Sequence, residues 1–309
     1  MRFLLTLFCL SLAFCTLEAK ELKVLMIGNS FSTSVTKFLP QVVNSVPGHT
    51  LQLTSAYIGG CQLERHYNNL LKSEKDPQFH PYEITTFDSA KTPHKQTHRK
   101  GSINELLKNN QYDIITLQQG SIKSFLTESY EPYTTELIKY IRKYQKNAEI
   151  VIQQTWAYRY DSARFAKWSL TQDQMYEQLN QAYKKAAAAH HLRMIPMGDA
   201  VQLYRQLTPQ KYQRPQPPLI YPQRDSNAGD PVGKSAWRTN KKTGERYKNY
   251  DCHHLNRNGE YMQALLWFAF LYNEPVSKAA YRPVKMEDQE IQLLKKCAQT
   301  ALDNLSKMR

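Results

Sequence analysis

Short apolar runs alternate with helix-like segments along most of this 309-residue chain, and this alternation constrains the fold more than any other feature. Each run is rich in apolar or β-branched residues and is bounded by polar or turn residues, as strands are. Strands that alternate with helices form a mainly parallel sheet with helices on both faces. The sequence therefore predicts an α/β fold, with strands at residues 23–27, 51–56, 114–117, 150–154 and 193–197.

Helical patterns fill the segments between and after these strands. The expected helices are residues 36–46, 62–71, 102–108, 131–145, 163–191, 255–272 and 286–307. Residues 208–250 break this rhythm, because they contain six prolines, many charges and few apolar residues. Such a segment predicts a polar insertion within one domain rather than a linker between two.

The N-terminus has the pattern of a secretory signal peptide. A short positive start precedes an apolar run over residues 3–17, and Ala19 is a small residue suited to cleavage. The run is short for crossing a bilayer, and a lipid anchor on Cys15 is disfavoured because a bulky residue precedes that cysteine. We expect a secreted or periplasmic protein without a transmembrane segment in its mature chain. Its signal peptide would cover residues 1–19 and its single domain residues 20–309.

The chain is strongly basic, with a formal net charge of +14. A basic surface favours anionic partners. Nucleic acid is not expected, because the basic residues are scattered and the protein is expected outside the cytoplasm. An acidic polysaccharide fits better. The insertion contributes an excess of positive charge, since three acidic residues (Asp225, Asp230, Glu245) stand among Arg214, Arg224, Lys234, Arg238, Lys241, Lys242, Arg246 and Lys248.

Four polar blocks stand where chemistry is expected. Three of them directly follow expected strands, and the fourth lies after the insertion. Ligands of open α/β sheets bind at the carboxyl ends of the strands, so these blocks are expected to meet. In chain order the blocks are Gly28-Asn29-Ser30-Phe31-Ser32, Gly59-Gly60, Gln118-Gln119-Gly120-Ser121 and Asp251-Cys252-His253-His254.

The order of these blocks resembles the SGNH (GDSL-type) hydrolase superfamily. More closely, it resembles a branch of secreted bacterial SGNH proteins without an assigned function. The resemblance implies a three-layer, flavodoxin-like fold and ester hydrolysis by a serine nucleophile. It implies no cofactor and no metal. Together with the strand–helix alternation, it predicts a five-stranded parallel sheet in the order 2-1-3-4-5, with the polar insertion placed before the Asp-X-X-His block.

In this resemblance Ser30 matches the nucleophile, His254 the base and Asp251 the residue that orients the base. A serine hydroxyl becomes a good nucleophile only when a base takes its proton. The Asp-X-X-His spacing lets the carboxylate accept the imidazole N–H, which fixes the tautomer. The neighbouring His253 is the rival base. Other interpretations of this block are a helix cap followed by surface histidines, or a metal cluster with Cys252.

An oxyanion hole is also implied by the resemblance. Its donors would be the backbone N–H of Ser30, the backbone N–H of Gly60 and a side-chain amide from the third block. Gly59 is the alternative register for Gly60, and a plain strand-to-helix turn is the competing interpretation. The Gln-Gly-Ser sequence resembles the Gln-Gly-Glu block of the sialate O-acetylesterase branch, which assigns the amide to Gln119, with Gln118 as the runner-up.

Three cysteines remain after residues 1–19: Cys61, Cys252 and Cys297. Cys61 and Cys252 belong to blocks that are expected to converge on the nucleophile. The sequence therefore allows either a disulfide between them or two free thiols. Cys297 lies in the apolar pattern of the last helix and is expected in the core. Four aromatic residues follow the fourth strand and would either stack on sugar rings or pack beneath the insertion: Trp156, Tyr158, Tyr160 and Trp168.

The sequence as a whole predicts a secreted carbohydrate esterase that removes O-acetyl groups from a polysaccharide or oligosaccharide. Acidic glycans are the favoured partners, because the protein is basic. The alternatives are a lipase or thioesterase of the same fold and a catalytically silent glycan-binding protein. The polar insertion argues against a lipase, because a lipase of this type would use a long apolar lid.

Overall fold

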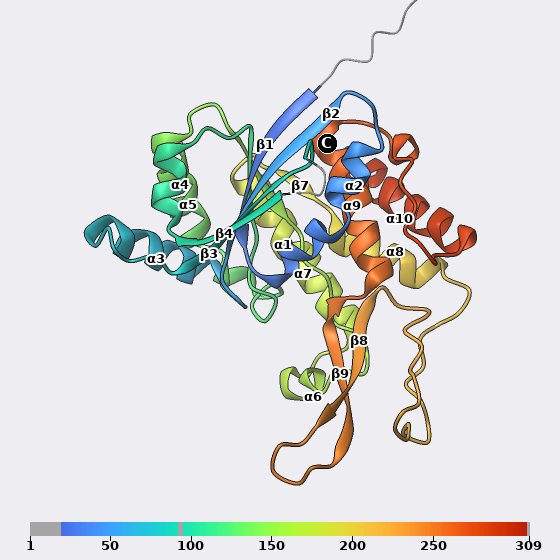
Figure 1. The fold of residues 1–309 in the computed structure, drawn as a ribbon. Coiled ribbons are helices and arrows are strands. Elements are labelled where there is room, and N and C mark those ends of the chain that lie inside the picture. The colour runs from blue at the N-terminus through green and yellow to red at the C-terminus, as the bar shows by residue number, and fades with distance from the viewer. Residues whose placement is uncertain (1–19, 92–94, 308–309) are drawn as a thin grey trace, which may run out of the picture.

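A seven-stranded sheet runs through the centre of the molecule, in the order β4-β3-β2-β1-β5-β6-β7 (Figure 1). The structure is a computed structural model that describes residues 20–91 and 95–307. The expected signal peptide therefore lies outside the described residues. The strands are β1 (Lys20–Gly28), β2 (His49–Tyr57), β3 (Tyr82–Asp88), β4 (Lys95–Gly101), β5 (Ile114–Leu117), β6 (Glu149–Gln153) and β7 (Arg193–Ile195).

The five predicted strands form the parallel part of this sheet. They pair as β2-β1-β5-β6-β7, which is the expected order 2-1-3-4-5. The predicted number of strands was wrong, because β3 and β4 extend the sheet beyond β2 as antiparallel neighbours. Strand β4 reads Lys-Gln-Thr-His-Arg-Lys-Gly and has no apolar run. Polar and charged residues are usual on an edge strand, where they discourage pairing with other chains.

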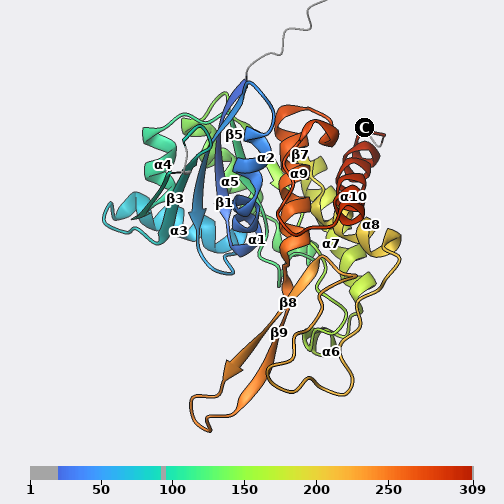
Figure 2. The same cartoon turned by 45° about the vertical axis from the view of Figure 1, so that its right-hand side comes forward.

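Helices cover both faces of the sheet. Figures 1 and 2 show α3, α4 and α5 on one side, and α2 and α9 on the other. Helix α9 is mostly apolar and is buried from Gly259 to Tyr272, with α2, α8 and α10 packed around it. The α-helices are α1 (Ser30–Thr33), α2 (Leu39–Asn44), α3 (Leu63–Lys75), α4 (Ile103–Asn109), α5 (Tyr133–Tyr144), α6 (Arg164–Trp168), α7 (Gln172–Ala189), α8 (Met197–Leu207), α9 (Arg257–Tyr272) and α10 (Asp288–Lys307).

The expected helices are present with three differences. The segment 36–46 is the end of a 3₁₀ turn followed by the short helix α2. The segment 163–191 is two helices, because Ser169 adopts a left-handed conformation after α6 and Thr171 then caps α7 with a capping box. Helix α8 was not predicted at all. Short 3₁₀ turns complete the structure: η1 (Ser34–Lys37), η2 (Thr127–Ser129) and η3 (Val276–Lys278). Within the described residues, no helix is both long enough and apolar enough to cross a membrane.

The predicted insertion consists of a loop and most of a hairpin. Residues 208–231 form the loop, and the antiparallel strands β8 (Val232–Thr239) and β9 (Arg246–Leu255) follow it. Both views show the hairpin projecting away from the central sheet (Figures 1 and 2). Because β9 leads directly into α9, the hairpin returns the chain to the body at the Asp251–His254 block.

Candidate active site

Ser30 stands at the sharp turn that joins β1 to α1. Strand β1 ends at Gly28, Asn29 caps the helix, and Ser30 is its first residue. A Cβ atom at Gly28 would lie 2.5 Å from the Ser32 Oγ atom, so only glycine allows this close turn. The Asn29 side chain accepts a hydrogen bond from the Phe31 N–H and donates one to the Cys61 carbonyl. An aspartate could not make the second bond, because a carboxylate only accepts.

A chain of hydrogen bonds connects Ser30, His254 and Asp251. The His254 Nε2 atom lies 2.8 Å from the Ser30 Oγ atom, and its Nδ1 atom lies 2.7 Å from the Asp251 Oδ2 atom. Because a carboxylate only accepts, Nδ1 carries the proton and Nε2 is left to accept from the serine hydroxyl. The structure thus brings together the three residues that the sequence assigned to catalysis. Their catalytic roles remain predictions.

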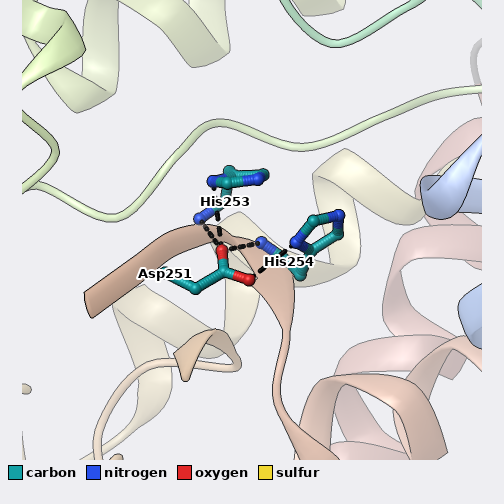
Figure 3. Close-up of side chains that lie close together, drawn as sticks. All are labelled: Asp251, His253 and His254. Atoms are coloured by element: carbon teal, nitrogen blue, oxygen red, sulfur yellow. Dashed lines mark hydrogen bonds and ion pairs between the residues drawn. The ribbon is translucent and has the colours of Figure 1, made fainter. Parts of the chain in front are cut away.

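Asp251 is held as an anion in this arrangement (Figure 3). Its Oδ1 atom accepts the backbone N–H groups of His253 and His254, each at 3.1 Å. Burial raises the pKa of the Asp251 carboxyl, but the bonds from the His254 ring and these backbone groups outweigh burial and hold that pKa well below its usual range. Asp251 therefore stays ionised and can orient His254 over the whole neutral and mildly acidic range.

The Asp-X-X-His block lies at the end of strand β9 and not in a helix cap. A register shift at Gly233 separates the pair Lys234–Asp251 from the pair Val232–Leu255. Gly233 has a φ of +112°, which favours glycine. The bulge bends the end of the hairpin, and the helix that follows is capped separately by Asn256.

His253 binds the other oxygen of the same carboxylate. Its Nδ1 atom lies 3.0 Å from the Asp251 Oδ1 atom, but the contact with Ser30 is made by His254. These three side chains are the group among the described residues whose ligand atoms, all within 4.8 Å of one another, could hold a metal ion (Figure 3). A metal there would compete for the Nδ1 atom that fixes the His254 tautomer, so the geometry favours the hydrogen-bonded arrangement.

The backbone N–H groups of Ser30 and Gly60 are the two expected oxyanion donors that remain to be described. Ser30 starts a helix, where N–H groups have no partner within the helix. Among the described residues, no acceptor pairs with the Gly60 N–H. Gly60 is exposed and has a φ of +60°, which favours glycine. The bond from Asn29 to the carbonyl of Cys61 ties this loop to the nucleophile turn at 2.9 Å.

The expected role of Gln119 is wrong in this structure. Its Nε2 atom donates to the carbonyl and hydroxyl oxygens of Ser129, at 2.9 and 3.0 Å, and its Oε1 atom accepts from the Leu63 and Gly120 N–H groups. The side chain is fully buried, so these protein partners satisfy it and leave no N–H for an oxyanion. Gln119 instead joins the third block to the start of α3.

The runner-up, Gln118, belongs to a buried amide network that sequence analysis missed. Its Nε2 atom donates to the Asn29 Oδ1 atom at 2.7 Å, and its Oε1 atom accepts from Gln153 at 2.6 Å. Gln153 and Gln263 both donate to the Phe31 carbonyl, beside the nucleophile. Buried polar residues at the end of an apolar strand were the available signal for Gln153. Through the Asn29 side chain and the Phe31 carbonyl, the network holds the turn that carries Ser30.

The three cysteines that the structure describes are free thiols. Cys61, Cys252 and Cys297 are each buried and unbridged, so the option of a Cys61–Cys252 disulfide does not hold. Burial raises the pKa of Cys61 to about 12 and that of Cys252 to about 11, which keeps both thiols neutral. Cys297 packs in the core as expected.

The aromatic residues after β6 pack within the protein for the most part. Trp156 is fully buried, stacks on Phe31 at 4.2 Å between ring centroids and donates to the His253 carbonyl. Tyr158 is also buried, and its hydroxyl lies 2.8 Å from Ser121. Tyr160 is 47 % exposed and contacts Tyr212 of the loop. Sugar stacking by Trp156 and Tyr158 is therefore excluded by their burial.

Comparison with known proteins identifies one family. Residues 23–211 match the family described as "Domain of unknown function (DUF4886)". A crystal structure of a DUF4886 family protein from Bacteroides uniformis has 27% sequence identity and a TM-score of 0.72, covering 92% of this chain and 95% of its own. The family match ends before the hairpin, so it includes Ser30 but not Asp251 or His254.

More distant solved structures are also similar to this chain. A proposed SGNH hydrolase from Slackia heliotrinireducens has 16% identity and a TM-score of 0.46, covering 80% of this chain and 96% of its own. A mutant of an acetyl-xylooligosaccharide esterase from Geobacillus has 11% identity and a TM-score of 0.44, covering 86% and 97%. No curated protein matches this sequence.

Proposed function

We propose that this protein, which belongs to the DUF4886 family, is a serine hydrolase that cleaves carboxylic esters, and that it removes O-acetyl groups from a glycan. The observation that carries the proposal is the hydrogen-bond chain Ser30–His254–Asp251, with distances of 2.8 and 2.7 Å. A nucleophile, a base and an orienting carboxylate in this geometry are the requirements for activating a serine hydroxyl.

The geometry supports a two-step acyl transfer. As the Ser30 oxygen attacks the ester carbonyl, His254 takes the hydroxyl proton and Asp251 stabilises the imidazolium. The backbone N–H groups of Ser30 and Gly60 would bind the negative oxygen of the tetrahedral intermediate. His254 then protonates the departing alcohol and an acyl-enzyme remains. Water, deprotonated by His254, releases the carboxylic acid and restores Ser30.

A short acyl group and a sugar alcohol are proposed because the insertion that leads into the Asp251–His254 block is polar. The preceding loop and the hairpin carry charges and amides. The Phe31 and Trp156 rings stack on each other. A long alkyl chain would gain little by burial in such surroundings. We also propose that the protein acts outside the cytoplasm, on the basis of the signal-like N-terminal sequence.

A series of p-nitrophenyl esters tests the proposed activity. We expect turnover of the acetate. The value of kcat/KM for the octanoate should be lower by about tenfold or more, because its extra methylene groups would find no apolar pocket. The Ser30→Ala protein serves as the blank for each ester. A preference for octanoate would indicate a lipase, and no turnover of any ester would leave a glycan-binding protein.

Gly60→Ala tests the second oxyanion donor. A side chain at a φ of +60° is strained, although nothing lies within 4 Å of the added Cβ atom. We expect the peptide to move and kcat on p-nitrophenyl acetate to fall by roughly ten- to a hundredfold, with little change in KM. Gly59→Ala is the matched control, since Gly59 lacks the left-handed conformation. An equal loss in both variants would contradict the assignment to Gly60.

A further inference from the structure

A basic groove lies between the loop 208–231 and the hairpin β8–β9. Its volume is about 420 Å³, and no aspartate or glutamate is among the described residues that line it. The side chains that matter here are three cations, Arg214, Arg246 and Lys248, and three aromatic rings, Trp237, Tyr247 and Tyr250. A concave surface with convergent charges and rings is typical of a ligand site.

Among the described residues, two of the three cations in this groove have no carboxylate partner. Within the described residues, Arg246 and Lys248 form no ion pair. The three acidic residues of the same segment contact other groups: Asp230 pairs with Arg205, Glu245 accepts from Thr243, and Asp225 accepts from the Tyr212 hydroxyl at 3.2 Å. Arg214 has only a 3.7 Å contact with Asp161. A groove of this kind focuses a positive potential on whatever enters it.

Aromatic rings hold the cations along the groove. The Lys248 Nζ atom lies 5.1 Å from the centroid of the Trp237 ring, and the Arg214 guanidinium lies 4.0 Å from that of Tyr250. These cation–π contacts order side chains that would otherwise move freely. The Tyr247 side chain is 48 % exposed and offers a rigid amphipathic surface beside them. Such rings suit a sugar, and the adjacent cations suit an acidic group on it.

The groove and the active site are connected by one strand, although none of Ser30, Asp251 and His254 lines the groove. Tyr250 immediately precedes Asp251, and Arg246 and Lys248 lie further out on the same strand β9. At roughly 3.3 Å per residue, Lys248 and His254 are about 20 Å apart along an extended strand. A small ester would not reach both places, but a polymer could occupy the groove while one of its units meets Ser30.

We infer that this groove is a subsite for a sugar unit carrying a carboxylate or sulfate, several units away from the ester that is cleaved. The inference rests on the proposed function for the link to catalysis, but the binding itself does not require turnover. It makes the hairpin β8–β9 a substrate-binding element. It also explains why a charged segment with few buried residues stands directly before the catalytic block.

Calorimetric titration with unacetylated oligosaccharides tests this subsite directly. The probes are hexagalacturonate, a chondroitin sulfate hexasaccharide, neutral xylohexaose and poly-glutamate as a polyanion without sugar. We expect one of the two acidic sugars to bind best, and the better one identifies the acidic group. Replacing both cations (Arg246→Gln with Lys248→Gln) should weaken that binding about tenfold, since two exposed charge contacts are lost.

A second double variant is the matched control. Lys241→Gln with Lys242→Gln removes the same charge from the hairpin turn, outside the groove, and should change affinity less than twofold. Thermal melts check that both proteins are folded. The subsite is refuted if the two double variants lose affinity equally, if poly-glutamate binds as tightly as the acidic sugars, or if neither acidic sugar binds.

Failure of the proposed function would look different. If wild-type protein binds hexagalacturonate or the sulfated sugar through this groove but hydrolyses no acetyl ester, the subsite stands and the esterase proposal fails. If it hydrolyses p-nitrophenyl acetate while the groove variants bind acidic sugars like wild type, the esterase stands and the subsite fails.

Discussion

Ser30→Ala is expected to reduce kcat on p-nitrophenyl acetate by roughly a thousandfold or more, and His254→Ala by a similar factor. Ser30 and His254 act as one unit at 2.8 Å, so either loss leaves the other without a partner. For the same reason the double variant should be hardly worse than either single one. Steady-state rates with matched active-site burst measurements would show this.

His253→Ala is the sharpest control for this experiment. The ring of His253 binds the same carboxylate as His254 and is similarly exposed, but it has no contact with Ser30. We expect its removal to lower kcat less than tenfold. Asp251→Ala should fall in between, because an unoriented base still works part of the time. If His253→Ala were as damaging as His254→Ala, the base would have been assigned to the wrong histidine.

The parallel part of the sheet could be predicted because its strands are buried on both faces. Val24, Leu25 and Met26 are completely buried, and such strands read as continuous apolar runs. Strands β3 and β4 leave no such signal, since they are partly exposed and antiparallel at the edge. Helix α8 was missed for a different reason. It starts at the end of a strand expected to reach residue 197, and it contains Gly198, where an added Cβ atom would lie 2.2 Å from the Thr155 carbonyl oxygen.

The candidate catalytic side chains could be proposed from the sequence, but the residues that hold them in place could not. Ser30, Asp251 and His254 stand in blocks whose residue types already indicate catalysis by a serine nucleophile. The glutamines do not, because a buried amide can donate in several directions and only the packing decides which. Gln119 turns toward Ser129 and Gln118 toward Asn29, so both support loops instead of facing the substrate.

A buried arginine holds the hairpin against the body, and no sequence pattern revealed it. The side chain of Arg159 is fully buried and forms a bidentate ion pair with Asp161, at 2.7 and 3.0 Å. Its guanidinium stacks on Tyr212 at 3.7 Å, and a Cβ atom at Gly233 would lie 2.3 Å from it. The backbone N–H of Arg159 also donates to the Cys252 carbonyl at 2.8 Å. Arg159 therefore contacts the loop, both strands of the hairpin and the Asp251–His254 block.

We expect Arg159→Met to lower the free energy of unfolding by about 3–5 kcal/mol, because it leaves the buried Asp161 without its main partner. Chemical denaturation measures this change. Arg193→Met removes the partly exposed Arg193–Glu149 pair and should cost about 1 kcal/mol or less. Replacing the whole pair, with Arg159→Met and Asp161→Leu together, should recover much of the loss, since no buried charge then remains unpaired.

The same variant separates stability from positioning. Arg159 touches neither Ser30 nor His254, but it fixes the strand that carries Asp251 next to Cys252. We therefore expect the Arg159→Met and Asp161→Leu double variant to regain stability while its kcat on p-nitrophenyl acetate stays below the wild-type value, with KM little changed. Full recovery of kcat along with stability would mean that Arg159 serves folding alone. A loss in Arg159→Met no larger than in Arg193→Met would mean that the ion pair does not hold the hairpin.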